Sequence, residues 1–572
     1  MSLNNLEIPK MKKLIYIFLI TIVSPIVCQA QLYPKDYDAV DFAFDSLYSV
    51  KYQDYMRVKD SIALVKLYGV LNEKINNAAV TDELIITNSS IHSLPISVSK
   101  LSNVNKVVFI NCKNLDVPKV LDQLADLPAL KSLAFTNCGL YSLPDNIVKL
   151  TNLESLGLKG NKIVQLNSYI AALPRLKHLD VSNNTLLNEE LLFERITNMI
   201  HLTHLDANYC AIRSLPRVGV SKLSHLSLSG NLLKELNQEI KATYLDISAN
   251  PFLEVEQVMN QLSNNPNLRY LNLSYNKLTD LPANIGDLST LVSLNLRGNK
   301  LTILPDEIGE LASLNVLKVD NPDVYLRTNQ LVSLPPGLGR LTNLDSLYLS
   351  GNKLKDLPDG FAKLSNLKFL DLSWNKFESF PTEIISLGNL SYLNLAVNHV
   401  KTIPENIGNL VKLNYLNCQG DFFVNYQLKI KTIPNTIGQL TQLKTLILAD
   451  NVIEQIPESI SNCAQLKTID LKDNLLNNLP ESFGQLTLLK SLNLKANEFG
   501  KLPQSFSKLK ALEFLNLSFN FKFESLQVSS LLGNLNTLKE LNLTDCYMTE
   551  EAVVELQKKL EQTIIITRVT RK

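Results

Sequence analysis

The chain has 572 residues, of which 45% are hydrophobic, and its 56 basic and 55 acidic residues leave a net charge of +1. This balance gives no overall attraction to nucleic acid or to an anionic membrane. We therefore expect neither of them as a partner.

The first predicted element is a secretory signal peptide over residues 1–30. A Lys12-Lys13 pair precedes an apolar run at residues 14–23, and Cys28-Gln29-Ala30 forms a small-x-small cleavage site. The run falls short of the roughly 20 residues that span a bilayer, which disfavours an uncleaved anchor. We expect cleavage after Ala30, no membrane span in the mature chain, and a secreted, periplasmic or cell-surface location.

Residues 31–80 form the next predicted region. Their Tyr, Phe, Leu and Val side chains recur at spacings of three and four, which is typical of helices. We expect a helical cap that shields the first open edge of the array described next.

From residue 81 onward the chain consists of units of about 23 residues, represented by residues 268–290, LRYLNLSYNKLTDLPANIGDLST. With Leu268 as position 1, leucines at positions 4 and 6 alternate with polar residues at 3, 5 and 7, which predicts a strand with one buried face. The amide of Asn at position 9 can satisfy backbone groups where the chain leaves the strand. Pro at position 15 predicts a turn on the return path, and Ile at 18 and Leu at 21 close the core.

About twenty such units fill residues 81–548. One unit cannot bury its apolar face alone, but stacked units can, so the pattern predicts a solenoid. Position 1 falls at Thr81, Val104, Leu130, Leu153, Leu176, Leu202, Leu223, Ala242, Leu268, Leu291, Leu314, Leu344, Leu367, Leu390, Leu413, Leu443, Leu466, Leu489, Leu512 and Leu538.

Some units depart from the standard return path. Those that start at Leu176, Ala242 and Leu512 have 26 residues and replace Pro with helical spacing, so we expect short helices on the outer side at residues 189–200, 255–262 and 528–535. The last unit predicts a helix capped by Thr549 and a closing strand at residues 563–568. We interpret residues 549–572 as a C-terminal helix-strand cap.

Two units carry an insertion directly after the strand. The units that start at Leu314 and Leu413 have 30 residues each, with extra residues at 320–329 and 419–427. Insertions into solenoids map to loops on one rim, which is often the binding rim. The inserted aromatic residues are Tyr325, Phe422, Phe423 and Tyr426.

The consensus LxxLxLxxNxLxxLPxxIGxLxx resembles the leucine-rich repeat superfamily. It is similar to the 23-residue type of the Ras-pathway leucine-rich scaffold and the plant intracellular Ras-group proteins, which also occurs in exported bacterial proteins. The resemblance implies an α/β horseshoe with a parallel sheet on the concave face, turns and short helices on the convex face, and protein or peptide binding on the concave face. The export signal departs from the Ras-pathway group, so we do not expect a cytosolic Ras-like partner.

Side chains at positions 3, 5 and 8 of neighbouring units predict a binding patch. Stacked parallel strands place equal positions about 4.8 Å apart, and positions 3, 5 and 7 share one face. Exposed aromatics with polar neighbours are typical binding anchors for proteins and peptides, and a glycan would use the same rings for stacking. The alternative is that the rings only pack laterally on their neighbours. The patch comprises Tyr348, Phe369, Asp371, Trp374, Tyr392, Asn394 and Tyr415.

A second column has histidine at position 3 of three consecutive units, namely His178, His204 and His225. Imidazoles at strand spacing could share a divalent metal, or could repel one another on protonation. The repeat itself imposes these intervals, so we favour a solvated polar ladder or a protein epitope, and we expect no metal and no cofactor.

The six cysteines after Cys28 occupy interior positions of the repeat, which favours core thiols over disulfides or a metal site. Cys112 and Cys138 lie in adjacent units and are the one pair close enough to test.

The sequence has no GxSxG, HExxH, Walker or GxGxxG motif in the required setting. We therefore predict a noncatalytic recognition scaffold that binds a protein or peptide. A glycan-binding adhesion protein is the alternative, and a metal-assisted hydrolase at the histidine column is a distant third.

Overall fold

The computed structural model describes residues 82–88, 91–95, 98–99, 101–216, 219–236, 240–263, 265–321, 328–422, 426–523 and 525–567. The chain divides into two units, residues 1–56 and 57–572, and every described residue belongs to the second. The predicted signal peptide (1–30) and helical cap (31–80) lie outside the described residues, as do Tyr325 and Phe423.

The described strands form one parallel sheet of 21 strands, which confirms the predicted fold class. Each strand pairs with the next in chain order, and the register joins equal positions of adjacent units, as in Leu271 with Leu294 and Leu294 with Leu317. The strands are β1 (Glu83–Thr87), β2 (Lys106–Ile110), β3 (Ser132–Thr136), β4 (Ser155–Gly157), β5 (His178–Asp180), β6 (His204–Asp206), β7 (His225–Ser227), β8 (Tyr244–Asp246), β9 (Tyr270–Asn272), β10 (Ser293–Asn295), β11 (Val316–Lys318), β12 (Ser346–Tyr348), β13 (Phe369–Asp371), β14 (Tyr392–Asn394), β15 (Tyr415–Asn417), β16 (Thr445–Ile447), β17 (Thr468–Asp470), β18 (Ser491–Asn493), β19 (Phe514–Asn516), β20 (Glu540–Asn542) and β21 (Ile564–Ile566).

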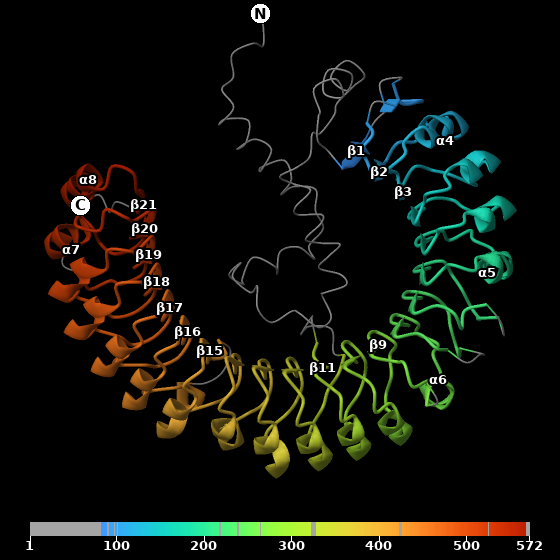
Figure 1. Ribbon diagram of the computed structural model, residues 1–572. Coiled ribbons are helices and arrows are strands. Elements are labelled where there is room, and N and C mark those ends of the chain that lie inside the picture. The colour runs from blue at the N-terminus through green and yellow to red at the C-terminus, as the bar shows by residue number, and fades with distance from the viewer. Residues whose placement is uncertain are drawn as a thin grey trace, which may run out of the picture. The chain divides into compact units, whose positions relative to one another are not determined.

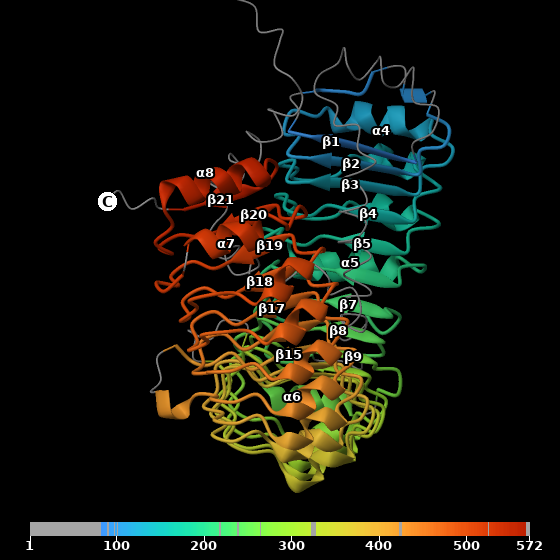
Figure 2. The same cartoon turned by 90° about the vertical axis from the view of Figure 1, so that its left-hand side faces the viewer.

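Within the second unit the strands line the concave side of a curved solenoid, and the helices follow its convex side (Figures 1 and 2). Most returns contain a single 3-10 turn that begins directly after the proline at position 15, as after Pro282, because proline removes an amide donor and fixes φ. The 3-10 turns are η3 (Asp145–Lys149), η4 (Ser168–Ala172), η5 (Ala283–Asp287), η6 (Asp306–Glu310), η7 (Pro336–Arg340), η8 (Asp359–Lys363), η9 (Thr382–Ser386), η10 (Glu405–Asn409), η11 (Tyr426–Leu428), η12 (Asn435–Gln439), η13 (Glu458–Asn462), η14 (Glu481–Gln485) and η15 (Gln504–Lys508).

The α-helices lie in the longer units. Helices α5 (Glu189–Asn198), α6 (Val255–Leu262) and α7 (Ser525–Leu532) confirm the three predicted outer helices, and in α8 (Glu550–Lys559) the Thr549 side chain accepts a hydrogen bond from the Ala552 N–H as a cap. Helix α4 (Val117–Ala125) was not predicted. Its proline lies in the first turn of the α-helix, where proline is tolerated, whereas in most other units the proline directly precedes a 3-10 turn.

One contiguous core runs between the sheet and the outer side. The leucines at positions 1, 4 and 6 and the isoleucine at position 18 of the representative unit, namely Leu268, Leu271, Leu273 and Ile285, are all 0% exposed. No helix among the described residues is long and apolar enough to span a membrane.

A ladder of buried asparagines at position 9 joins the units. Asn299 donates from Nδ2 to the carbonyls of Leu296, in its own unit, and Leu273, in the preceding unit, both at 2.9 Å. Its Oδ1 accepts the backbone N–H groups of Asn276 at 2.9 Å and Leu278 at 3.1 Å. One amide thus satisfies four backbone groups of two units.

Four cysteines occupy this position in place of asparagine. Cys210 donates from Sγ to the carbonyl of Val181 at 3.2 Å, and its own N–H donates to Asn231 Oδ1 at 3.0 Å. Burial raises the pKa of the Cys210 thiol to about 11, so the group stays protonated and can donate. The six cysteines of the described residues are buried and form no disulfide, which confirms the prediction of core thiols.

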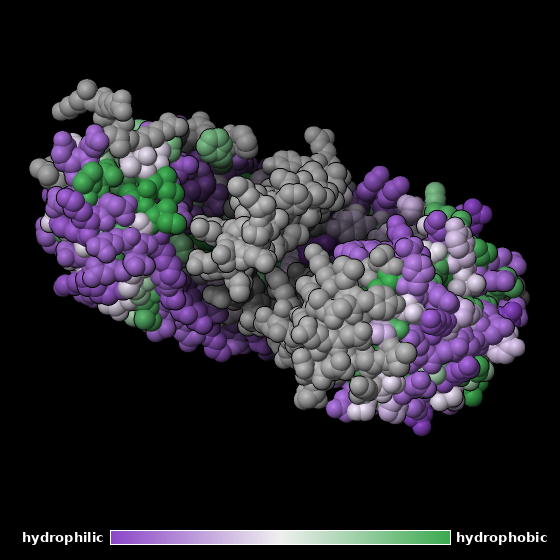
Figure 3. All heavy atoms as spheres, turned by 90° about the horizontal axis from the view of Figure 1, so that it is seen from above, coloured by the Kyte–Doolittle hydropathy of each residue, from purple (hydrophilic) through white to green (hydrophobic). Residues whose placement is uncertain are grey.

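The described surface is mainly hydrophilic in the view of Figure 3, but hydrophobic side chains gather at the C-terminal end. Val554 of α8 and Ile564 and Ile566 of β21 are 48%, 66% and 40% exposed. The last strand therefore presents an apolar face to solvent.

We predict that Asn299→Ala lowers the free energy of unfolding by about 2–5 kcal/mol, because it leaves buried N–H and C=O groups unpaired. Asn299→Cys should cost clearly less, since cysteine serves at the same position in four other units. Urea denaturation followed by circular dichroism measures both effects, and equal losses in the two variants would contradict the role of the amide.

Candidate functional site

The predicted aromatic patch forms a ladder of stacked rings on β12 to β15. The ring centroids of Phe369 and Tyr392 lie 4.2 Å apart, those of Tyr392 and Tyr415 4.3 Å apart, and both pairs are nearly parallel. Tyr348 extends the ladder, with its centroid 4.5 Å from that of Phe369. The sheet register thus places Phe369, Tyr392 and Tyr415 side by side as the column pattern predicts, whereas Tyr348 lies opposite Asp371 and contacts the ring of Phe369 from there.

The exposure of these rings differs from the expectation. Phe369, Tyr392 and Tyr415 expose 7%, 4% and 5% of their surface, so they are not exposed anchors in this structure. Packing on the neighbouring side chains hides the ring faces, which is the lateral packing considered as the alternative. Asn394 is also buried, at 3% exposure, and its Oδ1 accepts the Ala396 N–H at 3.1 Å.

Trp374 differs from the ladder, because it is 40% exposed at position 8, three residues after β13 ends. Its φ of 54° lies in the left-handed region, and its N–H donates to the carbonyl of Ala396 at 2.8 Å. Glycine occupies this conformation without strain, as Gly298 and Gly351 do in other units. A large exposed ring occupies the same position and conformation at Tyr275, so this φ is a property of the repeat.

Asp371 adds a titratable group to the patch. Its Oδ1 accepts hydrogen bonds from the Ser373 N–H at 2.9 Å and the Ser373 hydroxyl at 2.6 Å. Burial raises the pKa of the carboxyl to about 6, with a smaller contribution from the nearby Asp320 carboxylate, while the Ser373 bonds act in the opposite direction. The ionised form of Asp371 is therefore disfavoured in the folded protein.

The two insertions flank the ladder. Asn321 anchors the first: its Nδ2 donates to the carbonyl of Asn329 at 2.7 Å and to that of Gly351, and its Oδ1 accepts the Asn329 N–H at 2.8 Å. In the second, Phe422 is 71% exposed and Tyr426 begins η11. The structure thus places one strongly exposed aromatic side chain on the rim beside the ladder.

An ion pair lies between the first insertion and the neighbouring unit. Arg297 Nε is 3.0 Å from both carboxylate oxygens of Asp320, and its Nη2 is 2.9 Å from Oδ2. Next to it, the Lys318 ammonium lies 4.9 Å from the ring centroid of Tyr348. These contacts fix the N-terminal end of the ladder.

The histidine column is organised around one carboxylate. His178 Nε2 lies 2.8 Å from Asp206 Oδ2 and His225 Nε2 lies 3.3 Å from Asp206 Oδ1, so both imidazoles face Asp206. His204 stacks on His225 at 5.4 Å between centroids. Within the part of the chain that the structure describes, no group of three His, Cys, Asp or Glu side chains is arranged to hold a metal ion, so the geometry gives the metal hypothesis no support.

The same cluster includes a serine. Ser155 Oγ lies 3.3 Å from His178 Nδ1, which gives a Ser–His–Asp series with Asp206. Acyl transfer also needs donors aimed at an oxyanion. The N–H groups of Ser155 and His178 instead donate to carbonyls of the sheet ladder. The three side chains can relay a hydrogen bond. The two backbone N–H groups pair with the sheet, so they do not serve as oxyanion donors.

One charged feature was missed by the sequence analysis. Position 2 carries a row of lysines next to the concave face, including Lys444, Lys467 and Lys490 on consecutive units. Reading the column of position 2, as was done for positions 3 and 5, would have found it.

Comparisons with known proteins agree with this geometry. A profile described as "Leucine-rich repeat region" matches residues 244–350 and 458–567, and one described as "Leucine Rich repeats (2 copies)" matches residues 342–383. The matched residues carry leucine-rich repeats, and the described sheet has the fold of a leucine-rich repeat solenoid. The solved TLR13–ssRNA13 complex is 23% identical, with a TM-score of 0.52 over 84% of this chain and 80% of that one, which supports the fold.

Two further relatives are similar to this chain over different extents. A leucine-rich repeat protein of Leptospira interrogans is 27% identical and covers 88% of this chain and 100% of its own, with a TM-score of 0.44. The adenylate cyclase of Schizosaccharomyces pombe is 26% identical over 218 residues, or 36% of this chain. The match spans 12% of the length of that enzyme.

We predict that Asp371→Asn stabilises the protein at neutral pH, on the order of 2 kcal/mol, because it removes a carboxylate whose ionisation folding disfavours. The raised pKa means that wild-type stability falls as pH rises from about 4 to above 6. Asparagine can keep the same bonds, since Asn272 accepts both the N–H and the hydroxyl of Ser274.

Thermal unfolding of the two proteins at pH 4 and at pH 7.5 tests this effect of Asp371. The difference should be present at the higher pH and nearly vanish at the lower one. A stability difference that is independent of pH would contradict the assignment.

Proposed function

We propose that this protein is a noncatalytic recognition scaffold that binds a protein or peptide at the ladder of Tyr348, Phe369, Tyr392 and Tyr415 and along its rim. The observation that carries the proposal is the side chain of Trp374, the one tryptophan of the sequence. It is 40% exposed beside the ladder on a left-handed backbone. Because the left-handed backbone recurs at position 8 of most units, the support for binding comes from the exposure of this large ring and not from its φ.

The surroundings of Trp374 support a peptide ligand. A half-exposed indole offers a large apolar face and an N–H donor at a low entropy cost, which is why tryptophan is frequent at binding hot spots. Phe422 adds a second aromatic anchor on the rim, 71% exposed. The rings of the ladder form a rigid surface, since the centroid of each lies within 4.5 Å of that of its neighbour.

A glycan is the second candidate for the same surface. Its stacking on Trp374 would resemble that of a peptide side chain, and the carboxylate of Asp371 could accept hydrogen bonds from sugar hydroxyls. A competition experiment distinguishes the two ligands, because free sugars displace a bound glycan and leave a bound peptide in place.

We propose no catalytic activity for the histidine column. The Ser155–His178–Asp206 series lies on a sheet face, and the N–H groups of Ser155 and His178 are committed to the ladder. A metal-assisted hydrolase at His178, His204 and His225 remains the least supported alternative.

We predict that peptides selected from a random displayed library against the protein lose at least about tenfold in affinity on Trp374→Ala, since hot-spot tryptophans contribute 2 kcal/mol or more, roughly. Tyr141→Ala is the matched control, because Tyr141 is an aromatic residue at 59% exposure in a distant unit.

Isothermal titration with the selected peptides measures both affinities. Unchanged binding to Trp374→Ala, or equal loss in Tyr141→Ala, would count against the site. Displacement of the bound peptide by free mono- and disaccharides would shift the assignment to a glycan.

We further propose that the protein is an exported bacterial member of the 23-residue type, secreted, periplasmic or displayed at the cell surface. The support is the basic n-region, short apolar run and Cys28-Gln29-Ala30 motif of the sequence. We predict a mature N-terminus at Gln31 in the exported protein, measured by mass spectrometry. Recovery of an intact first 30 residues from the exported fraction would contradict cleavage at this site.

A further inference from the structure

In three parts of the solenoid, lysines at position 2 are paired with carboxylates at position 2 of neighbouring units. Glu154 lies 3.3 Å from the ammonium of Lys131 and 2.9 Å from that of Lys177. Lys368 lies 2.6 Å from Asp345, and Glu513 bridges Lys490, at 3.0 Å, and Lys539. In these three parts of the row unlike charges alternate, which removes repulsion between adjacent strands.

Lys444 and Lys467 break this alternation. The register pairs Thr445 with Thr468 and Thr468 with Ser491, so the lysines that precede these residues lie side by side, about 4.8 Å apart at the backbone. Both are exposed, and neither forms an ion pair within 4.0 Å among the described residues. With Lys490 they make three adjacent ammonium groups and one carboxylate, Glu513.

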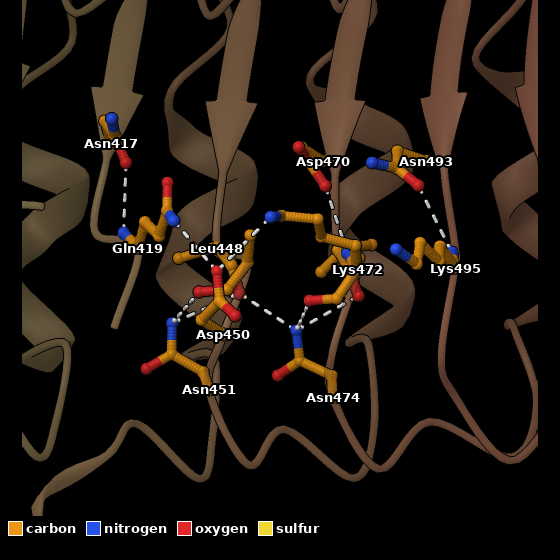
Figure 4. Close-up of polar contacts among 12 residues, drawn as sticks. Asn417, Gln419, Leu448, Asp450, Asn451, Asp470, Lys472, Asn474, Asn493 and Lys495 are labelled. Atoms are coloured by element: carbon orange, nitrogen blue, oxygen red, sulfur yellow. Dashed lines mark hydrogen bonds and ion pairs between the residues drawn. The ribbon is translucent and has the colours of Figure 1, made fainter. Parts of the chain in front are cut away.

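The opposite ends of the same strands carry two more lysines, Lys472 and Lys495, at position 7 (Figure 4). The Lys472 ammonium lies 3.5 Å from Asp450 Oδ2, which also accepts the Gln419 amide at 2.8 Å. The Lys495 ammonium lies 5.2 Å from the ring centroid of Phe519. Strands β17 and β18 are therefore bordered by lysines at both ends, whereas β16 is followed by Ala449 and Asp450.

The surface between the two lysine rows is short and polar. At position 3 it has Thr445, Thr468 and Ser491, and at position 5 it has Ile447, Asp470 and Asn493, all partly exposed. Figure 4 shows Asp470 and Asn493 on adjacent strands beside Lys472 and Lys495. The hydroxyl and amide groups can donate and accept hydrogen bonds, and the carboxylate accepts them.

We propose that β16 to β18 bind an anionic polysaccharide, whose sulfate or carboxylate groups contact Lys444, Lys467 and Lys490 while its hydroxyls contact the polar surface beside them. A polysaccharide chain that crosses the strands meets one ammonium per strand, and its anions supply the partners that Lys444 and Lys467 lack among the described residues, while Lys490 also pairs with Glu513. The site is separate from the aromatic ladder and goes beyond the proposed function.

Two features favour a polysaccharide over other polyanions. Single-stranded nucleic acid binds by stacking its bases on aromatic side chains, and positions 3 and 5 of β16 to β18 carry none. An acidic peptide would seek apolar contacts for its other side chains, and Ile447 is the only apolar residue among those six positions. Sugar hydroxyls match the threonine, serine, asparagine and aspartate groups.

The test uses the full-length chain and dextran sulfate as the probe, with neutral dextran as the uncharged reference. We expect dextran sulfate to bind at low salt and neutral dextran not to bind. The double variant Lys444→Gln/Lys467→Gln should bind dextran sulfate about tenfold more weakly, the sum of two exposed charge contacts. Biolayer interferometry gives the dissociation constants.

The matched control is Lys355→Gln/Lys363→Gln, which removes the same charge from two exposed lysines outside β16 to β18. Its affinity should change less than twofold, roughly, if the site is local. Equal loss in the control, or equal binding of neutral dextran, would overturn the proposal. Polyglutamate or single-stranded DNA that binds as tightly as dextran sulfate, with the same dependence on Lys444 and Lys467, would also overturn it in favour of a peptide or nucleic acid.

Discussion

The asparagine at position 9 is the interaction on which the rest of the structure depends. A solenoid of short strands leaves backbone groups unpaired wherever the chain turns out of the sheet, and buried groups of this kind are costly. The Asn299 amide satisfies two carbonyls and two N–H groups, and it does so across the boundary between two units. Because each amide must reach the preceding unit, every unit has to follow nearly the same path. The uniform register of the sheet follows from this requirement.

The same ladder explains where insertions are tolerated. In the unit that starts at Leu314, Asn329 takes the ladder position after the inserted residues and donates to the carbonyls of Leu296 and Val319. The insertion therefore enters between the strand and the ladder without breaking the contact between units. In the unit that starts at Leu413, Cys418 supplies the carbonyl to which Asn451 donates at 2.9 Å, so the following unit keeps its bond. Extra residues can thus reach the rim while the core stays continuous.

Much of the fold could be predicted, because the burial of Leu271 and Leu273 and the turn at Pro282 are local properties of the sequence. Helix α4 was missed because proline in a first helical turn and proline before a 3-10 turn have the same spacing. The columns of rings and histidines were predicted, but their contacts were not: the convergence of His178 and His225 on Asp206 and the low exposure of Tyr392 depend on side-chain rotamers. The left-handed backbone of Trp374 is likewise a property of position 8, which becomes visible once many units are compared in space.

Each strand has positions that form the core and positions that form the surface, so one scaffold can carry surfaces of different chemistry. Positions 4 and 6 must remain apolar, whereas positions 2, 3, 5 and 7 contact the core little and can vary. Adjacent strands therefore convert single substitutions into rows with a common chemistry: rings on β13 to β15, imidazoles on β5 to β7, and ammonium groups beside β16 to β18. In such a row each side chain has the same two neighbours, so a favourable pair recurs and an unfavourable one is repeated as well. A row of like charges is consequently harder to explain by folding stability than a row of rings, because stacking stabilises the rings while repulsion between lysines opposes the fold.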